Sequence, residues 1–357
     1  MKKHNFSAGP SILSEEVFKQ ASEGVLELNH SGLSILEISH RSDEFIAILE
    51  EAKALVFEFM QLDNEKYEVL FLQGGASMEF LRIPYNLLNQ GETAAYLDTG
   101  KWASNAIKEA KLFGNIHIVA SSKDQNYNYI PKNYTIPDDV KYLHITSNNT
   151  IYGTQIQYFK KENTSLICDM SSDIFSRTLD FSMFDLIYAG AQKNLGPAGV
   201  NLVVIKKEIL GKTNRPIPSI LDYQKHIDAQ SMFNTPPVFA IYTMLLNLKW
   251  LKNQGGISVI EKRNQQKADL LYREIDRNPL FEGTAQKEDR SMMNVTFVLK
   301  DLTQQGKFAE IFKKHHISGI NGHRIVGGYR ASIYNAMPLE SVKVLIQAMQ
   351  ELESIKK

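Results

Sequence analysis

Apolar and polar residues follow two kinds of pattern along this chain. Between residues 44 and 60 the apolar positions recur every three or four residues, which predicts a helix with one buried face. Short apolar runs separated by helical stretches predict buried strands. The expected strands are 67–72, 93–97, 116–119, 140–145, 165–168, 186–189 and 202–205. This alternation predicts an α/β fold with a mainly parallel sheet.

The second half of the chain changes pattern after a glycine break. Pro236 and Pro237 precede a long apolar helix that should run to about residue 252, and Gln254-Gly255-Gly256 interrupts it. We then expect helices to 277, over 308–315 and over 339–355, with strands at 294–299 and 330–334. The chain therefore predicts a large α/β domain of residues 1–254, and a smaller α+β domain of residues 255–357 on which the first residues can also pack.

Composition narrows the function classes. The 40 Lys and Arg residues balance the 40 Asp and Glu residues, so no nucleic-acid or anionic membrane partner is expected. No apolar stretch reaches about 18 residues, and the basic start has no apolar run after it, so we expect neither a membrane span nor a secretory signal. A cytoplasmic protein is predicted. Its single cysteine, Cys168, excludes an internal disulfide and a multi-cysteine metal site; we expect it to be buried and inert, and no metal site is predicted.

Two strand ends carry residues suited to cofactor chemistry. Lys193 follows the strand 186–189 among small residues, where partial desolvation would lower its pKa and free its amine for Schiff-base formation. A solvated loop lysine is an equally good interpretation of this segment alone. Asp169 ends the strand 165–168, at the sheet edge where ligands bind, and could hold the protonated ring nitrogen of pyridoxal phosphate. Taken alone, an aspartate there more often caps a helix or turn.

Three further segments could contact a phosphate or a flat ring. Gly74-Gly75-Ala76-Ser77 joins a strand to a helix, so its backbone N–H groups could approach a phosphate, although a plain tight turn is the commoner meaning. Asn234 and Thr235 precede another helix and offer donors, or act only as a cap. Trp102 begins a helix and could stack on a ring or simply pack in the core.

Two His-Arg pairs and one further arginine form the candidate anion site. His40-Arg41 precedes the helix at 44–60, while His323-Arg324 lies between glycines shortly before Arg330. Arginine binds carboxylate and phosphate through two parallel hydrogen bonds, and histidine can add another. Lone arginines are usually surface charges, but the glycine-flanked clusters favour a substrate that carries both a phosphate and a carboxylate.

Taken together, these motifs resemble the phosphoserine aminotransferases, class-V pyridoxal-phosphate enzymes of fold type I. The resemblance spans essentially the whole chain. Its motifs are NFSAGP at 5–10, HRS at 40–42, GGAS at 74–77, DMSS at 169–172, AQKN at 191–194, NTPP at 234–237, HRIVGG at 323–328 and RASIYNAM at 330–337. Each motif is weak or moderate, and their joint order makes the signal strong.

The resemblance implies a role for each candidate. Lys193 would hold pyridoxal 5'-phosphate as a Schiff base and shuttle a proton, and Asp169 would stabilise its ring nitrogen. Trp102 would stack on the ring, and Thr150 would lie near the ring hydroxyl. The cofactor phosphate would be bound by Ala76, Ser77 and Gln192, and by Asn234 and Thr235 from the neighbouring subunit of a homodimer. His40, Arg41, His323 and Arg324 would hold the substrate phosphate or the distal carboxylate of glutamate, and Arg330 the α-carboxylate.

The expected reaction is amino transfer between L-glutamate and 3-phosphooxypyruvate in L-serine biosynthesis, with a vitamin B6 pathway as a further possible use. Two alternatives stay open. Another enzyme of the same fold, such as an alanine–glyoxylate-type aminotransferase or a cysteine desulfurase, is one, although Cys168 lies in a strand rather than in a mobile loop. The second is a binding protein that keeps the fold without catalysis.

Overall fold

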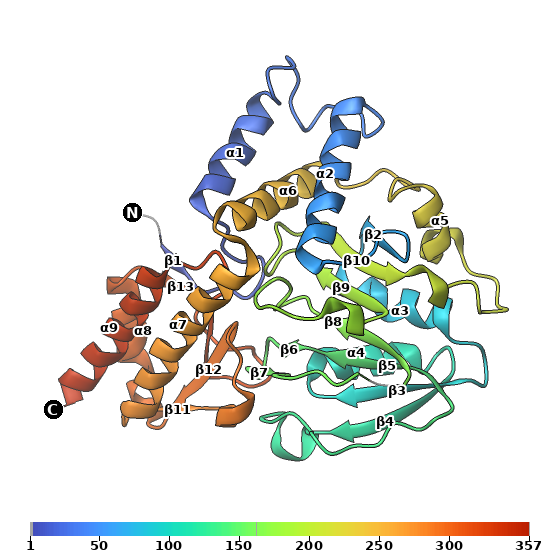
Figure 1. Ribbon diagram of the computed structural model, residues 1–357. Helices are drawn as coiled ribbons and strands as arrows, with labels where there is room; N and C mark the ends of the chain where they lie inside the picture. Colours follow the sequence, from blue (N-terminus) through green and yellow to red (C-terminus); the bar gives the residue numbers. More distant parts are fainter. Residues whose placement is uncertain (1–2, 162, 357) are drawn as a thin grey trace.

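The computed structural model describes residues 3–161 and 163–356, and a seven-stranded sheet forms the core of its larger part (Figure 1). Six strands run in the same direction and β10 is antiparallel to both of its neighbours. The mainly parallel α/β fold predicted from the sequence is therefore confirmed. In spatial order the strands are β2 (Tyr67–Leu72), β10 (Asn201–Lys206), β9 (Leu186–Gly190), β8 (Ser165–Asp169), β5 (Val140–Thr146), β3 (Thr93–Asp98) and β4 (Asn115–Ser121).

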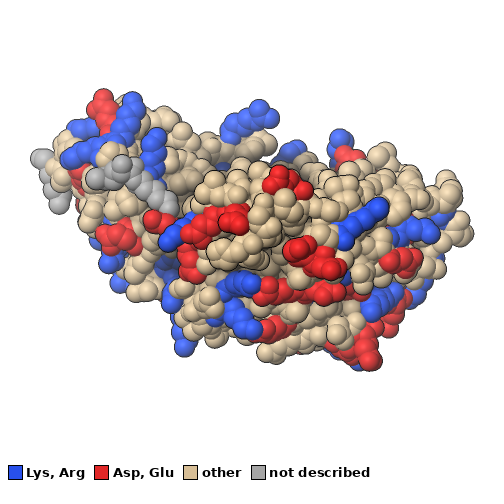
Figure 2. Space-filling view, turned by 90° about the horizontal axis from the view of Figure 1, so that it is seen from above, with Lys and Arg blue, Asp and Glu red and all other residues tan. Residues whose placement is uncertain are grey.

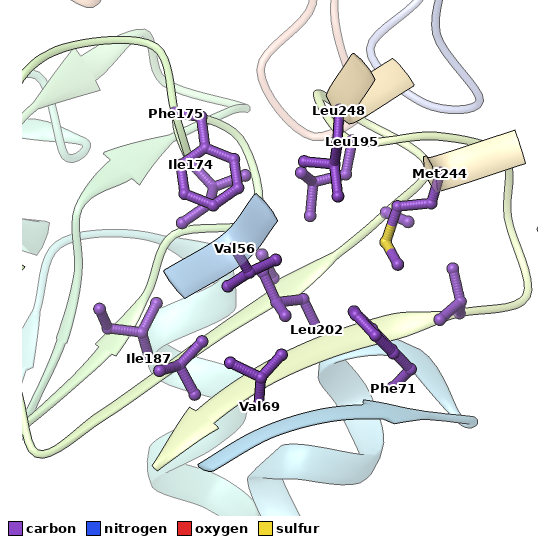
Figure 3. Close-up of a cluster of buried hydrophobic side chains, with 14 of the residues drawn as sticks. Val56, Val69, Phe71, Ile174, Phe175, Ile187, Leu195, Leu202, Met244 and Leu248 are labelled. Carbon is purple, nitrogen blue, oxygen red and sulfur yellow. The ribbon is translucent and has the colours of Figure 1, made fainter. Parts of the chain in front are cut away.

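Helices cover both faces of this sheet because its strands are apolar on both sides. In β2, Val69 and Phe71 face the hydrophobic cluster that includes α2 (Asp43–Met60) and α6 (Val238–Asn253). Leu70 and Leu72 face the opposite cluster, which includes α3 (Gly75–Leu87) and α4 (Lys101–Ala110). Figure 3 shows the first cluster, in which Val56 of α2 and Met244 of α6 point toward Leu202 of β10. Alternate residues of each strand thus bury against different helices.

The C-terminal part builds a second, smaller sheet with its own hydrophobic cluster. This sheet contains β11 (Phe281–Gly283), β12 (Asn294–Leu299) and β14 (Tyr329–Ser332), and its helices are α7 (Gly256–Arg277), α8 (Gln305–Lys314) and α9 (Leu339–Lys356). Near the N-terminus, β1 (His4–Asn5) pairs with β13 (Ile317–Ser318), and Phe6 belongs to the cluster of the smaller part. We propose that the two parts are domains divided near residue 254.

The remaining elements are short, apart from one helix that the apolar pattern does not reveal. Helix α1 (Glu15–Leu26) begins after Ser14, whose side chain accepts a hydrogen bond from the Val17 N–H. Only three of its residues are buried, which explains the weak apolar signal. The other short elements are β6 (Asn148–Asn149), β7 (Thr154–Gln155) and α5 (Tyr223–Asp228).

Several element ends differ from the sequence prediction by one to three residues, as at strand β14. Helix α4 ends at Ala110, because Leu112 and Phe113 bond to carbonyls only three residues back and tighten the last turn. Strand β14 stops at Ser332 rather than 334, and the carbonyls of the next two residues accept hydrogen bonds from Lys267 of α7.

Charged side chains of both signs are mixed on the face shown in Figure 2, with broad uncharged areas between them. This mixture agrees with the balance of 40 basic and 40 acidic residues. Over residues 3–161 and 163–356, none of the helices combines the length and the apolar character needed to cross a membrane.

Candidate active site

The two strand-end residues singled out in the sequence lie at the same edge of the large sheet. Asp169 is the last residue of β8, and the chain turns at Gly190, the last residue of the parallel neighbour β9, toward Lys193. The register pairs Asp169 with Tyr188, so both strands end within a few residues of each other. Carboxyl ends of parallel strands are where ligands of such sheets bind.

The amine of Lys193 has a defined position. Its Nζ atom donates a hydrogen bond to Oγ1 of Thr150 at 2.8 Å, and it lies 5.6 Å from the ring centroid of Trp102. Burial lowers the pKa of Lys193, while the negative charge of Asp169 acts in the opposite direction. The lowered pKa increases the fraction of neutral amine, which is the nucleophilic form.

Asp169 lies near enough to Lys193 for the two charges to interact. Its side chain is buried, and Oδ1 accepts a hydrogen bond from the Ser171 N–H at 2.9 Å. Burial raises the pKa of Asp169, and the positive charge of Lys193 opposes that rise. A buried carboxylate of this kind is well placed to gain from a cationic partner.

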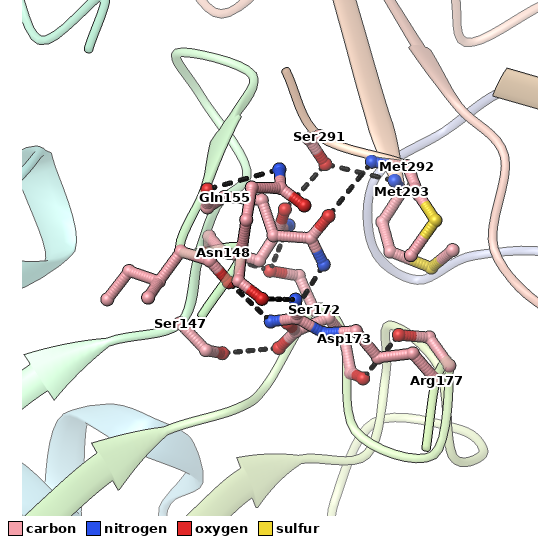
Figure 4. A network of polar contacts seen from close by, with 12 residues as sticks. Ser147, Asn148, Gln155, Ser172, Asp173, Arg177, Ser291, Met292 and Met293 are labelled. Carbon is pink, nitrogen blue, oxygen red and sulfur yellow. Dashed lines mark hydrogen bonds and ion pairs between the residues drawn. The ribbon is translucent and has the colours of Figure 1, made fainter. Parts of the chain in front are cut away.

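A buried polar network connects the Asp169 segment with the smaller sheet (Figure 4). The Ser147 hydroxyl donates to the Asp169 carbonyl at 3.0 Å, and the next residue, Asn148, donates to Ser172 Oγ at 2.8 Å. The same Asn148 amide donates to Asn294 of β12 at 2.7 Å. The network therefore fixes the position of this sheet edge against β12, since nearly every polar atom in it is satisfied by another protein group.

The glycine turn supplies free backbone donors. Gly74 and Gly75 have positive φ angles of 102° and 61°, which glycine adopts without strain, and α3 starts there without a side-chain cap. Ala76 is half-buried and Ser77 is exposed in the first helical turn. The uncapped N–H groups of that turn are suited to a phosphate.

A buried ion pair between Glu79 and Arg82 stabilises the start of this turn. Glu79 accepts a hydrogen bond from Arg82 Nη1 at 2.7 Å, and the same nitrogen donates to the Gln73 carbonyl at 3.2 Å. Gln73 Nε2 in turn donates to the Thr235 carbonyl at 2.6 Å. The structure thus brings the Thr235 carbonyl next to Gln73, which directly precedes the glycine turn, and both Asn234 and Thr235 are exposed.

Several cationic side chains lie near one another on the side of Lys193 where Arg330 acts on it electrostatically. Arg330 approaches the Thr150 carbonyl at 3.5 Å through Nη1, and burial lowers its pKa. Burial also lowers the pKa of His323, and the positive charges of Arg330, Arg324 and Lys101 lower it further. These groups therefore form one electropositive region.

Two contributors to the site were not identified from the sequence. Lys101 acts on His323 electrostatically, and its position directly before the candidate Trp102 was the sequence signal that could have identified it. Ser11 fixes the lysine turn: its N–H donates to the Gln192 carbonyl at 2.9 Å and its hydroxyl donates to the Lys193 carbonyl. It directly follows the NFSAGP motif at 5–10.

His40 and Arg41 are not brought to this site within the chain. They precede α2, on the loop that joins α1 to α2. Figure 1 places that loop at the end of α2 remote from β6, whereas Thr150 directly follows β6. Arg41 is exposed.

The arrangement fits pyridoxal phosphate. Lys193 offers an amine, Asp169 a buried carboxylate for a ring nitrogen, and the turn before α3 offers free N–H groups. The Nε1 atom of Trp102 is buried without a hydrogen-bond partner among the described residues. The indole that lies next to the lysine amine thus has an unused donor.

Comparisons with known proteins agree with this chemistry. Residues 3–345 match the family described as Aminotransferase class-V. A phosphoserine aminotransferase of Flavobacterium psychrophilum is 64% identical over 354 residues, covering 99% of each chain. A solved phosphoserine aminotransferase described as containing a Schiff base has 45% identity and a TM-score of 0.96, covering 99% of each chain. The PLP-bound phosphoserine aminotransferase of Trichomonas vaginalis has 34% identity and a TM-score of 0.93, covering 98% of this chain and 100% of its own. The chain belongs to the class-V aminotransferases and, within them, to the phosphoserine aminotransferase family.

Proposed function

We propose that the chain binds pyridoxal 5'-phosphate and transfers an amino group reversibly between L-glutamate and 3-phosphooxypyruvate, giving 2-oxoglutarate and O-phospho-L-serine. The observation that carries the proposal is the position of the Lys193 amine, between Thr150 and Trp102 and facing the cationic side chains near Arg330. The proposal includes the cytoplasmic location and the role in L-serine biosynthesis expected from the sequence.

Each site residue then has a chemical task. When bound, pyridoxal phosphate supplies an aldehyde that condenses with amines and a ring that accepts electron density. Lys193, with its lowered pKa, serves as the base that removes the Cα proton of the amino acid and returns it. The hydroxyl of Thr150 orients that amine, and Asp169 holds a proton on the ring nitrogen by its negative charge.

Substrate selection is assigned to the cationic groups. Arg330 would bind the α-carboxylate that all the amino- and keto-acid substrates share, since it lies close to Thr150 and acts electrostatically on Lys193. His323 and Arg324 would bind the distal phosphate or carboxylate. One site then serves both substrates, because each carries two anionic ends.

The active unit is proposed to be a homodimer. Leu26, Leu33 and Leu36, on and after α1, are 83%, 48% and 62% exposed, which is typical of a surface that another protein covers. The same loop carries His40 and Arg41, which have no task at their own site. We therefore assign them to the anion pocket of the partner subunit, and assign Asn234 and Thr235 to its cofactor phosphate.

The test is a single half-reaction. Purified protein loaded with pyridoxal phosphate is mixed with O-phospho-L-serine, without any keto acid, and quenched. We expect one equivalent of 3-phosphooxypyruvate per cofactor, together with a change in the absorbance of the bound cofactor. L-Alanine serves as the matched substrate without a phosphate and should react far more slowly.

The rival functions give different results. Reaction with L-alanine at the rate of O-phospho-L-serine would favour an alanine–glyoxylate-type aminotransferase. Binding of the cofactor without release of any keto acid would favour a non-catalytic protein. Either result would overturn the proposed function.

A further inference from the structure

A lysine outside the catalytic cluster is buried in an unusual way. Lys267 lies in α7 and is only 2% exposed. Among the described residues it forms no ion pair with a carboxylate. Its Nζ atom instead donates to two backbone carbonyls, those of Ile333 at 2.9 Å and Tyr334 at 2.6 Å. Lysine is rarely buried without an anionic partner, because its charge is costly to desolvate.

The bonding fits a neutral amine. Burial and the positive charge of Arg263 lower the pKa of Lys267 to about 7. A neutral amine has two N–H groups, and the two carbonyls use both of them. The two bonds can therefore persist whether or not the amine is protonated.

The two carbonyls belong to the segment that directly follows β14, the strand that carries Arg330. Strand β14 pairs with β12 on one side, and the segment after it leaves the sheet. The Tyr334 hydroxyl donates to the Ala8 carbonyl at 2.8 Å, in the N-terminal segment that also contacts the lysine turn. Lys267 thus fixes the chain three to four residues from Arg330.

The same segment is bonded to the turn that carries Lys193. The Asn335 N–H donates to Oδ1 of Asn194 at 3.0 Å, and Asn194 directly follows Lys193. Asn264, one turn before Lys267 on α7, donates to Oδ1 of Asn335 at 2.9 Å. One face of α7 therefore holds the 333–335 segment between the lysine turn and the arginine strand.

We propose that Lys267 is a positioning residue for the substrate α-carboxylate, acting through residues 333–335 to hold Arg330 at a fixed distance from Lys193. This inference rests on the proposed function, which assigns the α-carboxylate to Arg330. The residue touches neither substrate nor cofactor. Its effect is therefore expected in substrate affinity rather than in cofactor binding.

The test compares Lys267→Met with Lys262→Met, which changes an exposed lysine on the same helix. Methionine keeps the length of the side chain and removes both N–H donors. We expect KM for L-glutamate and O-phospho-L-serine to rise about tenfold each in Lys267→Met, with a smaller fall in kcat. Inhibition by inorganic phosphate, which probes the distal anion site, and cofactor affinity measured without substrate should each change by less than about twofold. Lys262→Met should match the wild type.

A purely structural role would give another pattern. Cofactor affinity and phosphate inhibition would then weaken together with KM, and that result, like an unchanged KM, would overturn the inference. If Lys267→Met does not fold, Asn264→Ala removes the adjacent hydrogen bond to Asn335 and should raise both KM values in the same selective way. KM values equal to those of the wild type in Asn264→Ala would also overturn the inference. Failure of the proposed function would appear separately, as absence of turnover by the wild-type protein.

Discussion

The Nζ atom of Lys193 donates a 2.8 Å hydrogen bond to Oγ1 of Thr150. The two residues are 43 positions apart and lie after different strands, β9 and β6. Thr150 also places its carbonyl 3.5 Å from Arg330. One threonine therefore contacts both the proposed catalytic amine through its side chain and the proposed carboxylate-binding group through its backbone.

Replacing Thr150 by valine should slow the reaction. Valine keeps the shape but cannot accept the Lys193 hydrogen bond, so the amine loses its fixed orientation. We expect kcat to fall about tenfold. Thr150→Ser, which keeps the hydroxyl, should stay close to wild type. Steady-state kinetics on the purified variants measure both, and a wild-type kcat in Thr150→Val would show that the contact is incidental.

Removing the amine itself should have a far larger effect. Lys193→Ala eliminates the group proposed to bind the cofactor covalently and to move the Cα proton, and turnover should fall by about 10³-fold or more. Borohydride reduction of the loaded protein, followed by peptide mass analysis, should label Lys193 in the wild type and no lysine in the variant. Lys111→Ala, which changes an exposed lysine just after α4, is the matched control. Full activity in Lys193→Ala would end the assignment.

Arg41 should act on the site of the partner subunit. Arg41→Ala alone should raise KM for phosphorylated substrates more than for a keto acid without a phosphate, because it removes a phosphate partner. A dimer that combines one Arg41→Ala chain with one Lys193→Ala chain contains one intact site if Arg41 acts across the interface. It should then have about half of the wild-type activity at low substrate concentration.

The purified heterodimer decides between the two arrangements. If Arg41 served its own chain, both sites of the mixed dimer would be defective and activity would not recover. Two differently tagged chains allow the heterodimer to be isolated free of either parent. Arg41 lies on the loop between α1 and α2, remote from β6 of its own chain, so we expect the heterodimer to recover activity.

Much of the fold could be predicted because its signals are local. The strands that carry Asp169 and precede Lys193 are continuous apolar runs, and Gly190, Gly196 and Pro197 mark the turn after the second of them. Parallel neighbours then place the strand ends together without further information. Helix α1 escaped because only three of its residues are buried, so its apolar pattern is sparse.

The contacts that refine the site could not be predicted in this way. Thr150 meets Lys193, and Lys267 meets Ile333, only after segments 43 and 66 residues apart are packed together. In the sequence Lys267 is an ordinary polar position in a mostly polar helix, and its burial is decided by the chain that covers it. In the proposed homodimer, the location of His40 and Arg41 relative to a binding site likewise depends on a second subunit.

Lys267 should make stability depend on pH in a defined direction. Its folded-state pKa of about 7 lies below the unfolded value near 10.4, so between these values the unfolded chain holds a proton that the folded chain does not. The contribution of Lys267 to the free energy of unfolding therefore rises as pH rises from about 7 toward 10, so the folded protein becomes more stable. Lys267→Met lacks the titration, so its Tm should fall further behind the wild type as pH rises.

Thermal unfolding of the two cofactor-loaded proteins at several pH values between about 6.5 and 9.5 measures this difference. Other charged groups near the lysine are the same in both proteins, so their contributions largely cancel in the comparison. The charged or titratable side chains that line the adjoining cavity of about 650 Å³ are Lys3, His4, Glu15, Arg263 and Glu340. A Tm difference between the wild type and Lys267→Met that stays constant or narrows with rising pH would mean that Lys267 keeps its proton in the folded state. Its charged amino group would then donate to the Ile333 and Tyr334 carbonyls throughout this pH range.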